Sequence, residues 1–314
     1  MLHKISMVLI VASMISLLPL SGCGPSATLS LKFAPDETAT YKATTELIKD
    51  YRFEQPSLGK LTEQQTKTAI TEEYSQTVQS VHEDGSADLQ ITIKGLKVNL
   101  VNKNELQLAF DSHDEKDQDS PLMKLIGKSY TIRMTPAGKV KVLDTKKTMA
   151  AVTSSYEKGI AKIILDSKNI VARHSILALP ADSARTFSVK NSWKEIAPSP
   201  PGLLAPKSFE KVYTVTDVKD NVATVSMVAA ESAEPAEGMI QAGGMGPLAK
   251  MFDNKDDYTG SMQVDLTGNQ VLNFEETLVS SYVAQQMPEN GDPEKGPDVL
   301  TMRLTNRVQV SKLD

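Results

Sequence analysis

Alternation of apolar and polar residues with a period of two is the feature that most restricts what this chain can fold into. The clearest segment is 300–310, where Leu300, Met302, Leu304, Val308 and Val310 share one phase with Asn306. The intervening phase is polar throughout, as in half-buried antiparallel strands. Four further segments show the same alternation: 87–93, 106–110, 130–134 and 262–266. The pattern predicts a mainly β protein built from antiparallel sheets.

Turn sequences separate these segments at hairpin spacing. Glu83-Asp84-Gly85, Thr135-Pro136-Ala137-Gly138 and Thr267-Gly268-Asn269 each lie between two alternating runs. Such Gly- and Asn-containing turns are typical of β-hairpins. After Ile93 the apolar phase shifts across Gly95, which predicts a bulge or bend there. The segment 50–60 lacks clean alternation, and its structure stays open.

Several phrases recur in the same order along the chain. Pro121-Leu122-Met123-Lys124 returns as Pro247-Leu248-Ala249-Lys250, and Tyr130-Thr131 returns as Tyr258-Thr259. One of these recurring phrases lies outside the strands. Duplication therefore explains the recurrence better than a chance similarity between the hairpin sequences of an all-β chain does. We therefore expect an α+β fold of two similar β-rich halves, barrel-like or sandwich-like. The expected boundaries are 1–22 for a signal peptide, 23–143 for the first half, 144–180 for a helical connector and 181–314 for the second half.

The connector carries the best helical pattern. Asp144 can cap it, and five apolar residues recur at steps of three and four: Met149, Val152, Tyr156, Ile160 and Ile163. A second apolar stretch, 170–179, ends at Pro180. We expect one broken helix or two short ones over 145–179.

The first residues indicate export. Lys4 precedes an almost unbroken apolar run over 5–20, and Leu20-Ser21-Gly22-Cys23 follows. This run is shorter than the roughly 20 residues of a spanning helix and ends in small residues, as a cleaved secretion signal does. An uncleaved anchor helix is the alternative. The Cys-containing box resembles that of bacterial lipoproteins, which implies diacylglyceryl attachment at Cys23 and removal of the leader.

Composition agrees with an anchored rather than a nucleic-acid-binding protein. Cys23 is the only cysteine, so no intrachain disulfide can form. With 34 basic and 39 acidic residues the chain carries a formal charge of −5, which is unlike a protein with a broad basic face. By resemblance to lipoprotein sorting signals, Gly24 favours the outer membrane, with another extracytoplasmic membrane face as the alternative.

Residues able to do chemistry are few. Of the histidines beyond the leader, His82 lies in a turn, His174 lies in the helical stretch as a surface or partly buried residue, and His113 lies in the acidic run 111–119. That run could offer metal ligands, but it lacks the Asp-x-Asp-x-Asp-Gly spacing of a calcium loop. Neither a nucleophile elbow nor a phosphate-binding glycine loop is present in the sequence. We expect no catalytic residues, no metal and no cofactor.

Apolar side chains around the repeated Pro-Leu-x-Lys phrase are the remaining candidates for a binding site. Flexible Met-rich surfaces often bind hydrophobic ligands. These residues either plug the ends of the sheets or form a paired lid over an apolar cavity. The lid would consist of Leu122, Met123, Leu125, Ile126, Met245, Leu248, Met251 and Phe252.

Taken with these phrases, the chain beyond the leader resembles a family of bacterial envelope lipoproteins of unknown function. The resemblance rests on Cys23, on the opening 33–41, on the segment 121–140 and on Leu179-Pro180 leading to Asn191-Ser192-Trp193. It implies a secreted, membrane-anchored, β-rich body without known catalytic residues. We expect a non-enzymatic protein that binds a hydrophobic or envelope-polymer ligand or scaffolds an envelope protein. The alternative is a lipoprotein hydrolase acting on cell-wall sugar or lipid.

Lipidation of Cys23 can be tested directly. Cells fed an alkyne analogue of palmitate should incorporate it into the wild-type protein, and Cys23→Ser should abolish the labelling because the chain has no other thiol. Recovery of an unlabelled full-length product with its leader attached would contradict the expectation.

Overall fold

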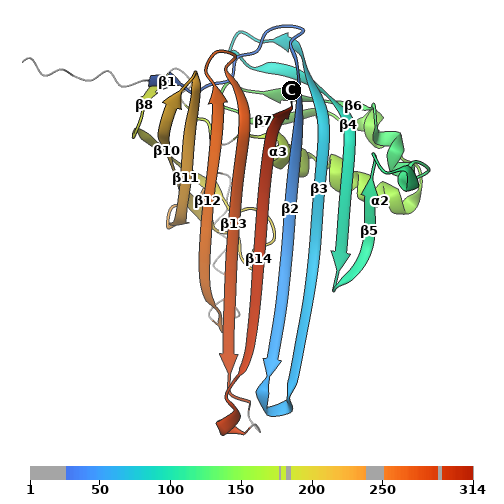
Figure 1. Cartoon of the computed structure of the whole chain (residues 1–314), viewed down its shortest axis with the longest axis vertical. Helices are drawn as coiled ribbons and strands as arrows, with labels where there is room; N and C mark the ends of the chain where they lie inside the picture. The colour runs from blue at the N-terminus through green and yellow to red at the C-terminus, as the bar shows by residue number, and fades with distance from the viewer. Residues whose placement is uncertain (1–25, 177, 182–184, 238–250, 289–291, 314) are drawn as a thin grey trace, which may run out of the picture.

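A computed structural model describes residues 26–176, 178–181, 185–237, 251–288 and 292–313. The described chain is mainly strand, which confirms the predicted fold class (Figure 1). The large sheet contains β2 (Thr38–Gln55), β3 (Lys60–Val81), β4 (Ala87–Asn102), β5 (Glu105–Asp111), β6 (Ser129–Met134), β7 (Val140–Asp144), β9 (Ser192–Pro198), β10 (Ser208–Lys219), β11 (Val222–Ser232), β12 (Asp253–Asp265), β13 (Gln270–Gln286) and β14 (Asp298–Leu313). A small sheet pairs β1 (Ser26–Thr28) with β8 (Thr186–Ser188). The helical elements are α1 (Lys146–Met149), α2 (Ser155–Leu165), α3 (Ser167–His174) and the 3₁₀ turns η1 (Pro56–Leu58), η2 (Glu115–Asp117), η3 (Pro121–Leu125) and η5 (Pro293–Lys295).

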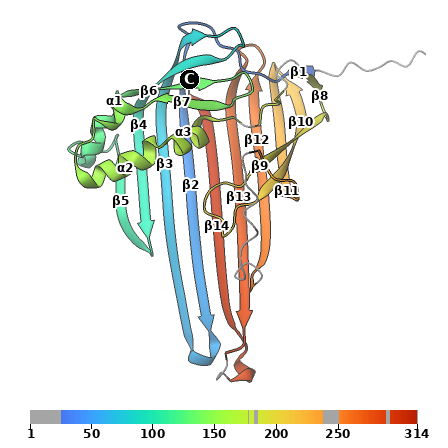
Figure 2. The ribbon, with the colours of Figure 1, turned by 180° about the vertical axis from the view of Figure 1, so that it is seen from behind.

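All strand pairs of the large sheet are antiparallel, in the order β7-β6-β4-β3-β2-β14-β13-β12-β11-β10-β9, with β5 beside β4. Within the described residues, β7 and β9 form the two edges and do not pair with each other. The sheet is therefore open rather than closed into a barrel. Its β6–β7 end curls over the face of β2 and β14, so the architecture is broadly sandwich-like (Figure 2).

The two predicted halves occupy neighbouring parts of one sheet. The first half contributes β2-β3-β4-β6-β7 and the second contributes β9-β10-β11-β12-β13, each as a meander. The last strand, β14, pairs with both β2 and β13 and so joins the halves through continuous hydrogen bonding. The duplication and its boundaries stay a prediction.

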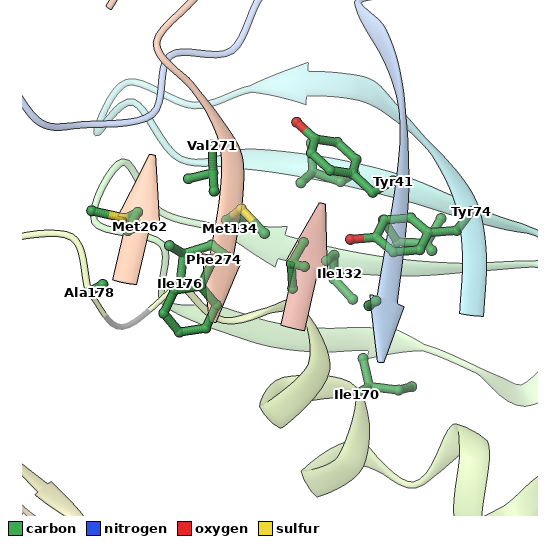
Figure 3. Packing of buried hydrophobic residues seen from close by; sticks show 14 of the residues in the cluster. Tyr41, Tyr74, Ile132, Met134, Ile170, Ile176, Ala178, Met262, Val271 and Phe274 are labelled. Carbon is green, nitrogen blue, oxygen red and sulfur yellow. The ribbon is translucent and has the colours of Figure 1, made fainter. Parts of the chain in front are cut away.

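One face of the long strands is covered and carries the core. The covered face is packed against β6, β7 and the helices (Figure 2). The rings of Tyr41 and Tyr74 stack 5.7 Å apart, and Phe274 lies beside Ile176 of the segment that follows α3 (Figure 3). Burial of such large apolar groups stabilises the fold by about 1.5–3 kcal/mol for each side chain.

The hairpins predicted from turn sequences are confirmed. They join β3 to β4, β6 to β7 and β12 to β13. The predicted bulge is also present, because the β3–β4 register shifts where Glu73 pairs with Gly95 and Tyr74 pairs with Ile93. The open segment 50–60 continues β2 to Gln55 and turns through η1.

The connector forms three short helices rather than one or two. The Asp144 carboxylate accepts the Lys146 amide at 2.9 Å, but Asp144 ends β7 and the N-cap residue of α1 is Thr145. In α2 the buried side is Ile160, Ala161, Ile164 and Leu165. The expected positions Tyr156 and Ile163 are instead 56% and 40% exposed, because α2 turns Ile164 rather than Ile163 toward the core.

Gly138 provides a test of the packing between the β6–β7 turn and the segment after α3. Its φ is +72°, and an added Cβ would lie 2.5 Å from the backbone oxygen of Ile176. Gly127 has a similar φ of +77° with nothing within 4 Å of an added Cβ. Gly127→Ala should therefore cost only the strain of the left-handed conformation, about 1–2 kcal/mol.

Gly138→Ala should cost at least about 2 kcal/mol more than this control, because backbone must move as well. The measurement is urea unfolding of the full chain followed by fluorescence of Trp193, the single tryptophan. Equal destabilisation by the two variants would contradict the packing described.

Candidate functional site

An apolar groove of about 430 Å³ crosses the covered face of the sheet beside the core. This volume lies in the range of small-molecule sites, which are concave and mostly apolar with a few placed polar groups. The groove is lined by Thr45, Glu46, Leu47, Thr68, Ile70, Ile163, Asn169, Val171, Ala172, Ser175, Pro198, Pro200, Pro201, Lys211, Tyr258, Phe274, Glu276, Asn306 and Val308.

The floor of the groove follows directly from strand register. Residues opposite one another in paired strands point to the same face. One row across β3, β2, β14 and β13 contains Ile70, Thr45, Val308 and Glu276. The next row contains Thr68, Leu47 and Asn306. The floor thus combines apolar side chains with two threonines and Asn306, and it acquires a carboxylate at its β13 end.

Helices and a proline-rich segment form the other walls. Val171 and Ala172 of α3 and Ile163 of α2 face the floor. The segment after β9 runs back across the sheet, where an added Cβ on Gly202 would lie 3.1 Å from side-chain carbons of both Leu47 and Leu304. Only a residue without a side chain fits this approach, since the φ of Gly202 is also +105°.

A buried ion pair, Lys211 of β10 with Glu276 of β13, lies at one end of the groove. The Lys211 ammonium lies 2.6 Å from Glu276 Oε2, and their side chains are only 2% and 10% exposed. Tyr258 donates its hydroxyl to the same oxygen at 2.8 Å, while Tyr213 donates to Glu276 Oε1 at 3.3 Å. The ammonium also sits 4.8 Å from the centre of the Tyr258 ring, a cation–π distance.

Burial around this ion pair favours the uncharged forms of the neighbouring side chains Tyr213, Tyr258 and Glu195. Burial, followed by the charge of Glu276, raises the pKa of both Tyr213 and Tyr258, so both hydroxyls keep their protons. Burial also raises the pKa of Glu195 on β9, against the opposing effect of Lys211. The cluster of Lys211, Glu276 and the two tyrosines therefore carries no net charge.

A second buried network lies in the core and does not line the groove. Arg173 of α3 is 3.0 Å from Glu72 Oε2 on β3, with both side chains at most 1% exposed. Tyr130 donates to Glu72 Oε1 at 2.8 Å, and its oxygen is 2.6 Å from His174 Nε2. Since the phenol has one proton, both contacts are satisfied when Nε2 carries the imidazole hydrogen.

His174 is thus fully buried, and its expected position at the helix surface or partly buried is wrong. Its partners are distant in sequence: the Tyr130 oxygen lies 2.6 Å from Nε2, and the Tyr74 ring meets the imidazole edge-on at 4.7 Å. Burial, and then the charge of Arg173, lower the pKa of His174 well below its usual value.

The structure places the predicted lid residues in different environments. Leu122 and Leu125 of η3 are buried in the core, and Met123 and Ile126 pack against it. Met251 is 55% exposed, and the ring of Phe252 meets Tyr282 edge-on at 6.5 Å. None of these six lines the groove. Met245 and Leu248 lie outside the described residues, and the proposed lid remains a prediction.

The exposed His113 and the half-buried His82 each face one acidic side chain. His113 Nε2 lies 3.2 Å from Glu73 Oε2, and His82 Nε2 lies 3.2 Å from Asp88 Oδ1. The absence of a side chain at Gly95 leaves room for the His113 contact, since an added Cβ would be 2.7 Å from Nε2. Among the residues that the structure describes, no group of three or more His, Cys, Asp or Glu is arranged to hold a metal ion.

The alternation of residues in the sequence could have revealed that Lys211 and Glu276 are buried. Lys211 shares the inward phase of β10 with Phe209, Tyr213 and Val215, and Glu276 lies between Phe274 and Leu278 in β13. A charged residue in the apolar phase of an alternating strand must be buried with a partner. Which partner it meets depends on the pairing of strands distant in sequence.

Comparisons with known proteins add no family. No protein-family model and no curated protein matches the chain. Among solved structures, one titled for lipid–protein interactions in lipovitellin is similar at 9% identity and a TM-score of 0.42, covering 90% of this chain and 26% of the other. The chain thus spans about a quarter of that protein. The crystal structure of Pseudomonas aeruginosa OpdQ gives 8% identity and a TM-score of 0.15, with 88% of this chain and 98% of the other covered.

Removing one partner of the buried pair should be far more harmful than removing an exposed one. Glu276→Ala leaves the Lys211 ammonium buried without a counter-charge, and we expect a loss of about 3–5 kcal/mol in unfolding free energy. Glu210→Ala is the control. It breaks the exposed Lys194–Glu210 pair, in which Nζ lies 2.8 Å from Oε1, and should cost at most about 1 kcal/mol. Urea unfolding followed by Trp193 fluorescence measures both; similar losses would contradict the burial described.

Stability should fall in acid partly through His174. Below about pH 6.5 His174 binds a proton in the unfolded chain but stays neutral in the folded one. The free energy of unfolding therefore falls by up to about 1.4 kcal/mol for each pH unit through this residue. His174→Phe keeps a ring against Tyr74 and should flatten the decline between pH 6.5 and 5. An identical slope in wild type and His174→Phe would refute this assignment.

Proposed function

We propose that this protein is a membrane-anchored, extracytoplasmic binding protein that holds a hydrophobic ligand in the groove between the sheet and α3. The observation that carries the proposal is the groove itself, whose lining is mainly apolar and whose volume is about 430 Å³. Apolar surface of this kind is normally covered in a soluble fold, because its exposure to water is unfavourable.

The chemistry of the groove supports binding better than hydrolysis. A glycosidase needs two carboxyl groups facing one bond. Of the two acidic residues that line the groove, Glu276 binds Lys211 and Glu46 binds Lys67 at 2.7 Å. Both carboxylates are therefore engaged with cations rather than directed together at a substrate.

The expected lipid anchor at Cys23 sets how the molecule, and with it the groove, is oriented on a membrane. β1 begins at Ser26, three residues after Cys23, and so lies within about 11 Å of it along the chain. The long hairpins end at the opposite pole of the molecule from β1 (Figure 1). An acylated Cys23 would therefore hold the β1 end at the membrane and direct the β2–β3 and β13–β14 hairpins away from it. No helix among the described residues has the length and apolar character needed to cross a bilayer.

Photo-crosslinking tests the binding site in the full chain. The protein in lipid nanodiscs is exposed to an acyl chain that carries a diazirine, and labelled peptides are identified by mass spectrometry. Labels should concentrate in 45–47, 171–175 and 306–308, which line the groove. Ala172 is exposed at the groove, so Ala172→Trp should fill the space and reduce this labelling about tenfold.

Lys168→Trp is the matched control, since Lys168 is exposed on the same helix but does not line the groove. It should leave the labelling intact. Labels scattered over the surface, or labelling insensitive to Ala172→Trp, would refute a hydrophobic ligand in the groove.

A further inference from the structure

The burial of Lys211 and Glu276 is not by itself evidence that the pair stabilises the fold. Desolvation of two charges offsets much of their attraction, and well-packed apolar residues commonly serve as well or better. The chain contains a second buried pair, Arg173–Glu72, within the core. Within the described part of the chain, Lys211 and Glu276 are the charged residues that are both buried and part of the groove lining, which suits a role toward what the groove holds.

The two groups offer a ligand both a donor and an acceptor. The Lys211 ammonium has three N–H donors. Glu276 takes one at 2.6 Å, and the Tyr258 ring faces the nitrogen at 4.8 Å. On Glu276, Oε2 accepts from Lys211 and Tyr258, whereas the one side-chain donor to Oε1 is Tyr213 at 3.3 Å. A carboxylate oxygen can accept two hydrogen bonds, so Oε1 has capacity for a ligand hydroxyl.

The local charge excludes an anionic head group. Lys211 is neutralised by Glu276, and Glu195 on the neighbouring strand is close enough to interact with both. A carboxylate or phosphate placed here would enter a poorly solvated site with no net positive charge, which is strongly unfavourable. A hydroxyl or an ester makes the same hydrogen bonds without this penalty.

We propose that the groove selects a neutral amphiphile, a glycerol ester of a single acyl chain, whose polar end binds Lys211 and Glu276. This inference rests on the proposed function, because it assumes that the apolar part of the groove takes the chain. The floor then orients the ligand: the acyl chain lies over Val308, Leu47 and Ile70, and the glycerol lies at the β10–β13 end.

Competition between two ligands of equal chain length tests the inference. The full chain in nanodiscs is labelled with a diazirine-bearing monoacylglycerol, and either unlabelled monoacylglycerol or the corresponding fatty acid is added at pH 8. The monoacylglycerol should compete at a concentration at least about tenfold lower, which corresponds to about 1.4 kcal/mol. Equal or better competition by the fatty acid would overturn the inference without any variant.

A double variant then assigns the selectivity. Lys211→Met with Glu276→Leu removes both charges together, so that neither is left unpaired, and it should keep groove labelling while losing the preference for the glycerol ester. Lys194→Met with Glu210→Leu, at the exposed pair on neighbouring strands, should keep the preference. Retained selectivity in the first variant would also overturn the inference. Absence of groove labelling by both monoacylglycerol and fatty-acid probes in the wild type would instead contradict the proposed function.

Discussion

The architecture depends on covering the apolar face of a very long sheet. β3 alone has 22 residues, about 70 Å of extended chain, and the alternation of side chains makes its inward face less polar than its outward face. The curled β6–β7 end, the three helices and the segment after β9 cover the upper part of that face (Figure 2). The groove lies where this covering layer stops short of the sheet, so the feature that stabilises the fold also creates the candidate site.

Among the residues that the structure describes, two ion pairs have both partners buried, Arg173–Glu72 and Lys211–Glu276. Arg173 and Glu72 are closed off by Tyr130 and His174, and they join α3 to β3 inside the core. Lys211 and Glu276 join β10 to β13 at the groove. In each case a tyrosine from the repeated Tyr-Thr phrase, Tyr130 or Tyr258, donates to the buried carboxylate. The carboxylate that Tyr130 binds lies in the core, whereas the one that Tyr258 binds lines the groove.

Much of the fold could be predicted from local pattern, and the reasons are specific. The hairpins follow from turn residues within a few positions of one another, and the bulge opposite Glu73 follows from the phase shift at Gly95. The short helices were harder, because their ends depend on contacts with strands that lie far away in sequence. Ile163 illustrates this: its spacing is that of a core residue, yet it lines the groove because α2 turns Ile160 and Ile164 toward the core instead.

The sequence by itself determined the β-rich class and the hairpins, because both depend on residues close together along the chain. The tertiary structure alone decided that β14 joins the two halves, that Lys211 meets Glu276 and that α3 leaves a groove above Leu47 and Val308. The pairing of β2 with β14 joins residues far apart in the sequence, such as Leu47 with Asn306 and Thr40 with Leu313. Long-range pairing of this kind is set by the combined packing of the whole sheet, which no local pattern contains.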